Sequence, residues 1–257
     1  MLSKISISEF SGLLELQTKV YGIFNIPFIS DILKDYCSAC VLDVGTGEGS
    51  FLLKLAEKNP NTKFTGIEID PGLFKISQAR LMNSDISNVE LYNKLFDRKY
   101  STKHDVIISR FVLQHHADPL EYLDMVFNSL NDNGTFICIE PVYDYYDCAK
   151  PEAIWKEFRN KMLKTYKRWG SNPNIPKQIC KYLSDACFTN IHVSINLYSH
   201  ATIDRASFNS ILQNTVTWLT EIHPDIWEKH FIRDLLQWLD VTDSFPYITI
   251  ANIKAMK

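Results

Sequence analysis

A glycine-rich segment at residues 41–50 constrains the fold more than any other part of the chain. It reads Val-Leu-Asp-Val-Gly-Thr-Gly-Glu-Gly-Ser, so glycine occupies three alternate positions. An apolar run at residues 40–42 precedes the glycines, and a helical pattern begins at Ser50. Glycine has no Cβ, so the backbone can turn tightly and a ligand can lie against it. The segment predicts a strand, a turn and a helix whose unpaired N–H groups face a nucleotide-like ligand.

The spacing of the glycines separates two classes of nucleotide site. The NAD type has G-x-G-x-x-G, with its last two glycines three residues apart. Here Gly47 and Gly49 are two apart, and Asp43 stands two residues before Gly45. This pattern resembles motif I of the class I S-adenosylmethionine-dependent methyltransferases, and the resemblance extends from about residue 41 to residue 140. It implies S-adenosylmethionine as the cofactor.

The rest of the chain alternates apolar strands with helical patterns. Beyond the strand opened by Cys40, we expect strands at residues 63–69, 89–92, 105–109, 135–139, 191–198 and 247–253. Continuous apolar strands between helices predict a parallel sheet covered on both faces. Together with the resemblance, this predicts an α/β fold with a doubly wound, mostly parallel, seven-stranded sheet. Such sheets bind ligands beyond the carboxyl ends of their strands.

The chain is expected to form a single domain, residues 1–257, with three regions. Residues 1–36 form a helical segment that Pro27 should break. Residues 37–142 form the cofactor-binding core, and residues 143–257 form the acceptor-side half. A helical insertion at residues 204–240 separates the last two strands and carries three tryptophans. We expect it to pack over the acceptor pocket and the N-terminal helices, with a homodimer contact as the alternative.

The glycine turn is expected to hold the methionine tail and the ribose of the cofactor. The residues concerned are Gly45, Thr46 and Gly47. Asp43 has two readings of equal weight: it organises the turn or holds the ammonium of the tail through water, or it caps the N–H groups of the turn itself.

The resemblance places further cofactor contacts after the second and third strands. Glu68 matches the acid that accepts hydrogen bonds from both ribose hydroxyls, and a carboxylate has two oxygens for this purpose. Ile69 follows it, and Asp70 is better suited to cap the next helix. After the third strand the usual Gly-Asp pair is missing. Asp97 is the candidate for the adenine amine and Phe96 for stacking, and both are equally readable as ordinary loop residues.

The segment after the fourth strand should pass beside the sulfonium. Arg110 is expected to pair with the cofactor carboxylate or with an internal acid, and Phe111 to border the cofactor. His115 is the catalytic candidate nearest to the transferred methyl group, with a backbone-bonded helix-start histidine as the alternative. Tyr143, in an acid and tyrosine cluster after the fifth strand, is the second catalytic candidate. Tyr21 is expected either to fold over the cofactor or simply to pack in the N-terminal helix.

These features favour an enzyme that transfers a methyl group from S-adenosylmethionine to a small molecule. The whole pattern is similar to ubiquinone and menaquinone biosynthesis methyltransferases. A nucleic-acid methyltransferase of the same fold is the first alternative, although residues 109–112 lack the Asn/Asp-Pro-Pro-aromatic motif of amino-directed enzymes. A non-catalytic S-adenosylmethionine-binding scaffold is the second alternative.

Composition limits the partners and the compartment. The net charge of −3 gives no sign of a nucleic-acid partner, which usually needs a basic face. No apolar run approaches the roughly 20 residues that span a bilayer, and no secretory signal is visible. The six cysteines are therefore expected to be free thiols in the cytoplasm. Cys37 and Cys40 have metal-knuckle spacing without a second pair, so no metal is expected.

Overall fold

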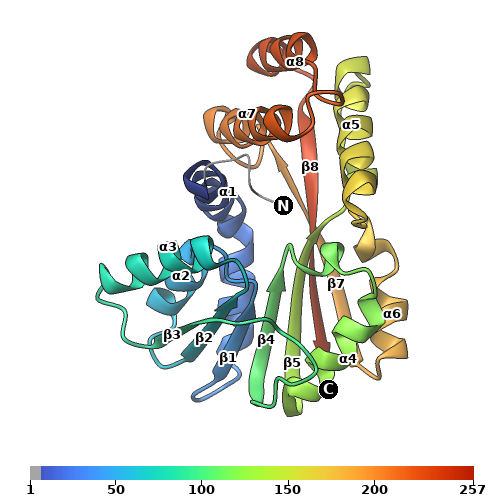
Figure 1. The fold of residues 1–257 in the computed structure, drawn as a ribbon. Coiled ribbons are helices and arrows are strands. Elements are labelled where there is room, and N and C mark those ends of the chain that lie inside the picture. The colour runs from blue at the N-terminus through green and yellow to red at the C-terminus, as the bar shows by residue number, and fades with distance from the viewer. Residues whose placement is uncertain (1–6) are drawn as a thin grey trace.

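The fold centres on one eight-stranded sheet. Figure 1 shows helices on both sides of this sheet. The computed structural model describes residues 7–257. The strand order is β3-β2-β1-β4-β5-β8-β6, and β7 pairs with β8. The strands are β1 (Cys40–Val44), β2 (Lys63–Glu68), β3 (Val89–Asn93), β4 (His104–Arg110), β5 (Leu130–Pro141), β6 (Asp147–Cys148), β7 (Thr189–Ser199) and β8 (Pro246–Met256). The first five are parallel, whereas β8 runs antiparallel to β5, β6 and β7.

Eight helices surround the sheet within the described residues. They are α1 (Ile7–Leu33), α2 (Ser50–Lys58), α3 (Pro71–Met82), α4 (Pro119–Ser129), α5 (Ala153–Trp169), α6 (Ile179–Asp185), α7 (Arg205–Ile222) and α8 (Lys229–Val241). Three short 3-10 turns, η1 (Leu113–His115), η2 (Tyr143–Tyr145) and η3 (Ile175–Lys177), complete the set. Across residues 7–257, none of these helices combines the length and apolarity that crossing a membrane demands.

The strands are apolar on both sides because helices cover both faces of the sheet. On β4, Val106 and Ile108 belong to the core cluster shared with α1 and α2. Ile107 between them belongs to the opposite cluster, shared with α4 and α6. This alternation confirms the doubly wound α/β prediction. The sheet has one strand more than predicted because the two-residue β6 pairs with the start of β8.

Local capping signals were read correctly in one place and wrongly in another. Asp70 caps α3, and its Oδ1 accepts from the backbone N–H groups of Gly72 and Leu73 at 2.8 and 2.9 Å. The sequence favours Gly134 as the left-handed residue after α4, because glycine has no Cβ, but in the structure Asn133 has this conformation, with φ of 62°. Gly134 serves a close approach instead, since a Cβ there would lie 2.8 Å from the Asn131 carbonyl oxygen.

The N-terminal segment is one helix, and the predicted break at Pro27 is wrong. Residues 1–6 of that segment lie outside the described residues. Pro27 sits inside α1 with an exposed ring, while Ile26 and Ile29 beside it are buried. Asn25 of α1 donates to the Asn252 amide oxygen on β8 at 3.0 Å. These tertiary contacts offset the cost of an interior proline, about 3 kcal/mol.

The insertion between the last two strands is helical, as predicted, and comprises two helices. It contains α7 and α8, separated at residues 223–228. Phe10 of α1 stacks on Trp218 of α7 with ring centroids 5.2 Å apart. Trp155 of α5 contacts Trp238 of α8 at 6.0 Å. Figure 1 shows α7 above α1 and beyond the carboxyl ends of the parallel strands. The insertion therefore packs on the N-terminal helix, as the sequence predicted.

Replacing Pro27 by alanine should stabilise the protein. The substitution restores an N–H donor for the Ile23 carbonyl and removes only an exposed ring. We expect the free energy of unfolding to rise by about 1–3 kcal/mol in chemical denaturation. Gly12→Ala, at an exposed position of the same helix where a Cβ meets nothing, is the control and should add only about 1 kcal/mol. A lower stability for Pro27→Ala would show that the proline shapes α1 in a way the fold requires.

Candidate functional site

The glycine turn after β1 is fixed by backbone geometry. Gly45, Gly47 and Gly49 all have positive φ, at 72°, 60° and 87°. The N–H groups of Gly45 and Thr46 both donate to the Ile67 carbonyl, at 2.9 and 3.0 Å. A Cβ on Gly45 would lie 2.7 Å from Val112 Cγ2, so this position accepts glycine only. Backbone hydrogen bonds therefore hold the turn against the end of β2 without help from a ligand.

Glu68 joins the same turn from the end of β2. Its Oε2 accepts from the Gly47 N–H at 2.8 Å, and its Oε1 accepts from the Asp70 N–H at 2.8 Å. The side chain is buried, and burial raises its pKa above the usual value. Each carboxylate oxygen retains a further lone pair, so Glu68 can still accept from a diol, and its contact with the ribose stays a prediction.

Asp43 is buried directly beneath the turn. Its Oδ2 accepts from the Thr46 hydroxyl at 2.7 Å, and burial raises the pKa of this carboxyl to about 6. The N–H groups of Gly45 and Thr46 go to Ile67 instead. Asp43 therefore organises the turn through the Thr46 side chain rather than by capping those backbone groups.

Arg110, at the end of β4, brings a positive charge to this edge of the sheet. Its guanidinium lies over the Phe51 ring at 4.2 Å and donates to the Thr18 hydroxyl at 3.4 Å. Its Nη1 is buried and finds no hydrogen-bond acceptor within residues 7–257. Burial lowers the pKa to about 10, and the Asp43 carboxylate opposes this shift. A buried cationic donor without an acceptor is a place for a carboxylate.

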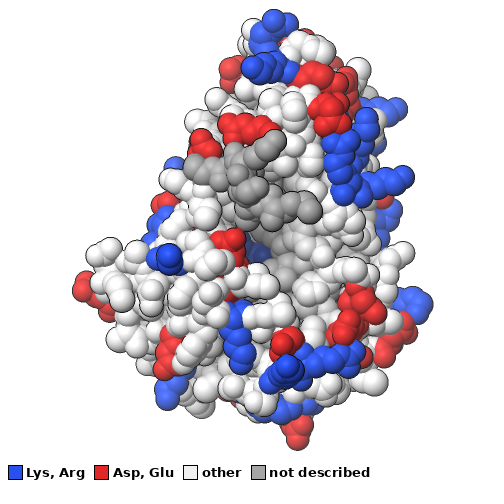
Figure 2. Space-filling view, viewed as in Figure 1, with Lys and Arg blue, Asp and Glu red and all other residues white. Residues whose placement is uncertain are grey.

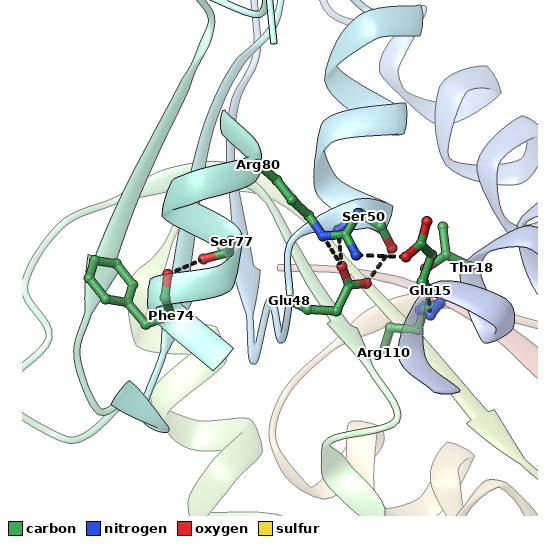
Figure 3. Close-up of polar contacts among 8 residues, drawn as sticks. All are labelled: Glu15, Thr18, Glu48, Ser50, Phe74, Ser77, Arg80 and Arg110. Atoms are coloured by element: carbon green, nitrogen blue, oxygen red, sulfur yellow. Dashed lines mark hydrogen bonds and ion pairs between the residues drawn. The ribbon is translucent and has the colours of Figure 1, made fainter. Parts of the chain in front are cut away.

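Ion pairs made by Arg80 connect the turn to α1, and Figure 3 shows the residues concerned facing one another. Arg80 of α3 lies with Nε 2.9 Å from Glu48 Oε2, and its Nη2 lies 2.7 Å from Glu15 of α1. Glu48 is buried and also accepts from the Ser50 hydroxyl. Arg80 thus bridges the glycine turn and the N-terminal helix, a connection that sequence reasoning missed because its residues are far apart in the chain.

The N-terminal helix lies across the turn. The Leu14 side chain of α1 would stand 3.2 Å from a Cβ placed on Gly47. Tyr21, seven residues further along α1, meets the Phe111 ring edge-on at 5.8 Å. Its carbonyl accepts from the Tyr198 hydroxyl at 3.1 Å, and its own side chain is buried. Tyr21 therefore packs against Phe111 at the end of β4, and its contact with the cofactor stays a prediction.

Phe111 carries backbone strain at the end of β4. Its φ of 60° is uncommon for a bulky residue. The conformation is held by a hydrogen bond from its N–H to the Ile139 carbonyl at 2.8 Å. Strained residues of this kind cluster at functional sites. The sequence predicted Phe111 as a site residue but gave no signal of the strain.

A cavity of about 710 Å³ begins at Phe111 and extends between α1, α5 and α7. Aromatic rings make up much of its wall, including Phe10, Tyr21, Phe158, Tyr166, Trp169 and Trp218. Gln114 and His115 of η1 and Tyr143 of η2 line it near the ends of β4 and β5. Figure 2 shows a hollow near the middle of the face below α7. The sequence placed aromatic residues here but did not show that they enclose one space.

Both catalytic candidates, His115 and Tyr143, line this cavity, and both contact Tyr166. The His115 ring is stacked on Tyr166 with centroids 6.1 Å apart and planes 12° apart. The Tyr143 hydroxyl donates to the Tyr166 hydroxyl at 3.3 Å. Burial and the neighbouring His116 lower the pKa of His115 to about 4, and burial raises that of Tyr143 well above its ordinary value. Both side chains are neutral at pH 7.

The residues predicted to contact the adenine do not gather at one place, unlike those at the glycine turn. Ile69 is 62% exposed beside Glu68. Phe96 is buried in the core, 5.3 Å from the Tyr100 ring and 5.8 Å from the Tyr122 ring. Asp97 accepts from the Lys99 N–H at 2.9 Å in a loop turn. The packing of Phe96 therefore gives no support to adenine stacking.

Potential metal ligands do not gather at this site. Within residues 7–257, no group of three or more His, Cys, Asp or Glu side chains is placed to hold a metal ion. All six cysteines are free, with Cys37 and Cys40 exposed.

Glu140, at the end of β5, is a buried acid that sequence reasoning did not select. It accepts from the Leu113 N–H at 2.7 Å and the Gln114 N–H at 3.4 Å, which fixes η1 beside the cavity. Its Oε2 meets no hydrogen-bond donor in the described part of the chain. Burial raises the pKa of Glu140 from 4.5 to about 8.

This shift predicts a pH dependence of stability. Between the two pKa values the folded protein binds more protons than the unfolded chain, so the free energy of unfolding falls as pH rises. We expect chemical denaturation from pH 6.5 to 8, above the pKa of Asp43, to show this fall as the difference in free energy of unfolding between the wild type and Glu140→Gln, because the lowered pKa values of histidines such as His104 and His115 affect both proteins alike. Glu90→Gln, at an exposed position, should follow the wild type. Parallel slopes for all three proteins would contradict a neutral Glu140.

Comparison with known proteins agrees with this geometry. A family model described as a methyltransferase domain matches residues 38–219. Among curated relatives, the chain is 25% identical over 122 residues to a carboxy-S-adenosyl-L-methionine synthase of Campylobacter lari, covering 46% of this chain and 52% of that protein. It is 34% identical over 116 residues to a tRNA U34 carboxymethyltransferase of Campylobacter jejuni, covering 43% and 38%. The chain thus spans about half or less of the length of these two relatives.

Solved structures show the same fold over most of the chain. The YcgJ protein of Bacillus subtilis aligns with a TM-score of 0.60 and 12% identity, over 90% of this chain and 97% of that one. A phosphoethanolamine N-methyltransferase of Haemonchus contortus, in complex with S-adenosyl-L-methionine, aligns with a TM-score of 0.56 and 15% identity, over 88% and 51%. With the family model, the sheet order and the glycine turn in agreement, the chain belongs to the class I S-adenosylmethionine-dependent methyltransferases.

Proposed function

We propose that this enzyme transfers the methyl group of S-adenosylmethionine to a small organic molecule held in the cavity between α1, α5 and α7. The observation that carries the proposal is the position of the cavity. It starts at Phe111, Gln114 and His115 after β4, next to the glycine turn. Its volume lies within the usual range of small-molecule sites, roughly 300–1,000 Å³.

The residues at the glycine turn fit the cofactor. The unpartnered Arg110 Nη1 suits the carboxylate of the methionine tail, and Asp43 beside it suits the ammonium. The free lone pairs of Glu68 suit the ribose diol, with Gly45, Thr46 and Gly47 forming the floor. Thr18 and the Phe51 ring hold the Arg110 guanidinium in position.

The remaining cofactor contacts are proposed from position alone. Ile69, exposed beside Glu68, offers an apolar surface to the adenine. Asp97 is proposed for the adenine amine, with Phe96 supporting the loop from the core. Tyr21 and Leu14 of α1 cover the turn from the other side.

The bound cofactor supplies an activated methyl group, so the protein mainly has to orient the acceptor and exclude water. Orientation alone is worth roughly 7–11 kcal/mol in favourable cases. His115 and Tyr143 stand where an acceptor from the cavity reaches the end of β4. We assign them to the acceptor rather than to the cofactor.

A tRNA acceptor is the second candidate, because one relative is named as a tRNA U34 carboxymethyltransferase. Figure 2 shows Lys and Arg gathered beside α5, with acidic side chains close to them. Of the basic side chains on α5, Lys161 is paired with Glu228 and Arg168 with Asp225. Pairing of this kind leaves less charge for phosphates, which dominate nucleic-acid affinity. The small-molecule acceptor is therefore preferred.

The compartment and the assembly are proposed on separate grounds. All six cysteines are free, which is typical of proteins from a reducing cytoplasm. The insertion buries its aromatic residues against α1 and α5 of the same chain. It therefore does not need a second subunit to cover them, and the homodimer stays an alternative.

Two substitutions test the cofactor site. Gly47→Val should abolish binding of S-adenosylhomocysteine, because a β-branched side chain resists the positive φ and fills ligand space. Glu68→Ala should weaken binding by about 1–3 kcal/mol, the range for losing a buried hydrogen-bond partner. Isothermal titration calorimetry measures both, and Glu90→Ala on β3 is the matched control. Wild-type affinity in the two site variants would remove the cofactor from this turn.

NAD and NADP provide a specificity control in the same titration. The last two glycines of the turn, Gly47 and Gly49, are two residues apart, whereas the last two glycines of the dinucleotide pattern are three residues apart. Neither dinucleotide should compete with S-adenosylhomocysteine. Competition at similar concentrations would favour an oxidoreductase instead.

The acceptor class is tested by transfer of a labelled methyl group. Purified enzyme with methyl-labelled S-adenosylmethionine is incubated with either bulk tRNA or a small-molecule extract. We expect label in the small-molecule fraction and none above background in tRNA. Label in tRNA alone would overturn the small-molecule assignment and leave the methyltransferase assignment intact.

A further inference from the structure

We propose that the outer edge of β7 is a docking surface for a second copy of this chain, which pairs its own β7 antiparallel across a two-fold axis at Ile195. The pairing joins the sheets of two subunits into one. Three observations carry the inference: backbone groups of β7 that face away from β8, an open segment that is symmetric about Ile195, and the absence of charge on that segment. The pairing does not depend on the acceptor of the methyl group.

β7 is an edge strand of the sheet. Among residues 7–257 it pairs with β8 alone, in an unbroken register from His192 to Ser199. Successive side chains of a strand point to opposite faces. Both Val193 and Ser194, which point to opposite faces, are exposed. The described part of the chain therefore leaves both faces of this stretch open to solvent.

The backbone of β7 directs hydrogen-bonding groups outward at alternate residues. Leu197 lies opposite Thr249 on β8, and the Thr249 carbonyl accepts from the Val142 N–H at 3.0 Å, on the far side of β8. Opposed residues of an antiparallel pair either exchange both hydrogen bonds or point these groups away from each other. The backbone groups of Leu197 therefore face outward. Those of Val193 and Ile195 do the same, because they share its place in the alternation.

The open edge of β7 is bounded at both ends. The Thr202 hydroxyl donates to the Leu197 carbonyl at 2.9 Å and accepts from the N–H two residues further along the strand at 2.9 Å. These bonds close the edge beyond Leu197. At the other end, the register shifts before His192. The open segment is therefore residues 193–197, and its midpoint is Ile195.

A two-fold axis at Ile195 matches this segment to itself. Ile195 then lies opposite the partner's Ile195, and Val193 lies opposite the partner's Leu197. Val193, Ile195 and Leu197 are 40%, 45% and 48% exposed and share one face of the strand. The pairing sets apolar side chains against each other and forms about six backbone hydrogen bonds. The Leu197 carbonyl has a second lone pair for this purpose besides the one used by Thr202.

The sequence of β7 lacks the features by which exposed edges avoid pairing. Natural edge strands are short or carry charges, proline or bulges. Residues 191–199 contain no Asp, Glu, Lys, Arg, Pro or Gly. By contrast β3, at the opposite edge, has five residues and an exposed Glu90. A foreign strand could use the same backbone groups, but symmetry about Ile195 is required only for pairing with a second copy.

The pairing closes at two subunits. A two-fold axis uses the same edge on both subunits, so no β7 edge remains for a third. The segment is short, which places the interface at the low end of the size range for specific complexes. We expect a dissociation constant on the order of 10 µM.

Sedimentation velocity of the full chain, over about a hundredfold range of concentration around that value, tests the pairing. The wild type should pass from monomer to dimer with no larger species. Val193→Lys combined with Leu197→Lys opposes two lysines at each of two symmetric places and should weaken the dimer by about tenfold or more. Val193→Lys combined with Leu197→Glu opposes unlike charges at the same places and should keep the dimer.

Two further variants test the backbone and the location. Ile195→Pro removes an outward N–H while it spares the bonds to β8, so it should also weaken the dimer. Tyr92→Lys, at a position 49% exposed on β3, places a lysine on the opposite edge and should dimerise as the wild type does. Circular dichroism checks that each variant is folded. If Ile195→Pro fails to fold, the two double variants still decide the outcome.

The outcomes decide between β7 pairing and its alternatives. A wild type that stays monomeric at every concentration, or that forms larger assemblies, would overturn the inference. A dimer equally stable in the Lys–Lys and Lys–Glu variants would place the contact elsewhere on the molecule. A dimer that a folded Ile195→Pro retains in full would show that the backbone edge takes no part.

Discussion

The hydrogen bond from the Gly47 N–H to Glu68 is the contact on which the site depends. It joins the turn after β1 to the end of β2, and the bonds from Gly45 and Thr46 to Ile67 reinforce it. Because these donors are backbone groups, side-chain identity matters only where positive φ or close packing demands glycine. The turn is consequently preorganised by the sheet register, and Asp43 and Arg110 project from the neighbouring strand ends into the same space.

Elements with strong local signals were predictable from the sequence. Asp70 followed by proline marks a helix start, and the structure shows the predicted cap. The apolar strands alternate between two core clusters, as a doubly wound sheet requires. Local signals failed where tertiary contacts decided the outcome. Pro27 is carried inside α1 by buried neighbours, and Gly134 is needed for close backbone packing rather than for a left-handed conformation.

Sequence reasoning reached residues that the structure brings together at the glycine turn, whereas the cavity wall was much less predictable. Motif spacing led to the glycine turn, and the resemblance led to Glu68, which the structure joins to Gly47. The pairing of Arg80 with Glu15 and Glu48 joins three distant segments, and no short pattern announces such a contact. The same holds for Tyr166, which connects His115 to Tyr143 from α5. An enclosed cavity is a property of assembled helices, so its walls follow from tertiary packing rather than from periodicity.

The N-terminal helix has a consequence for the order of events in turnover. Leu14 covers the glycine turn, and the same helix forms one wall of the cavity through Phe10 and Tyr21. A side chain or ligand placed against Gly47 therefore meets the same helix that lines the cavity. A change in the position of α1 would alter the surroundings of the glycine turn and the shape of the cavity together.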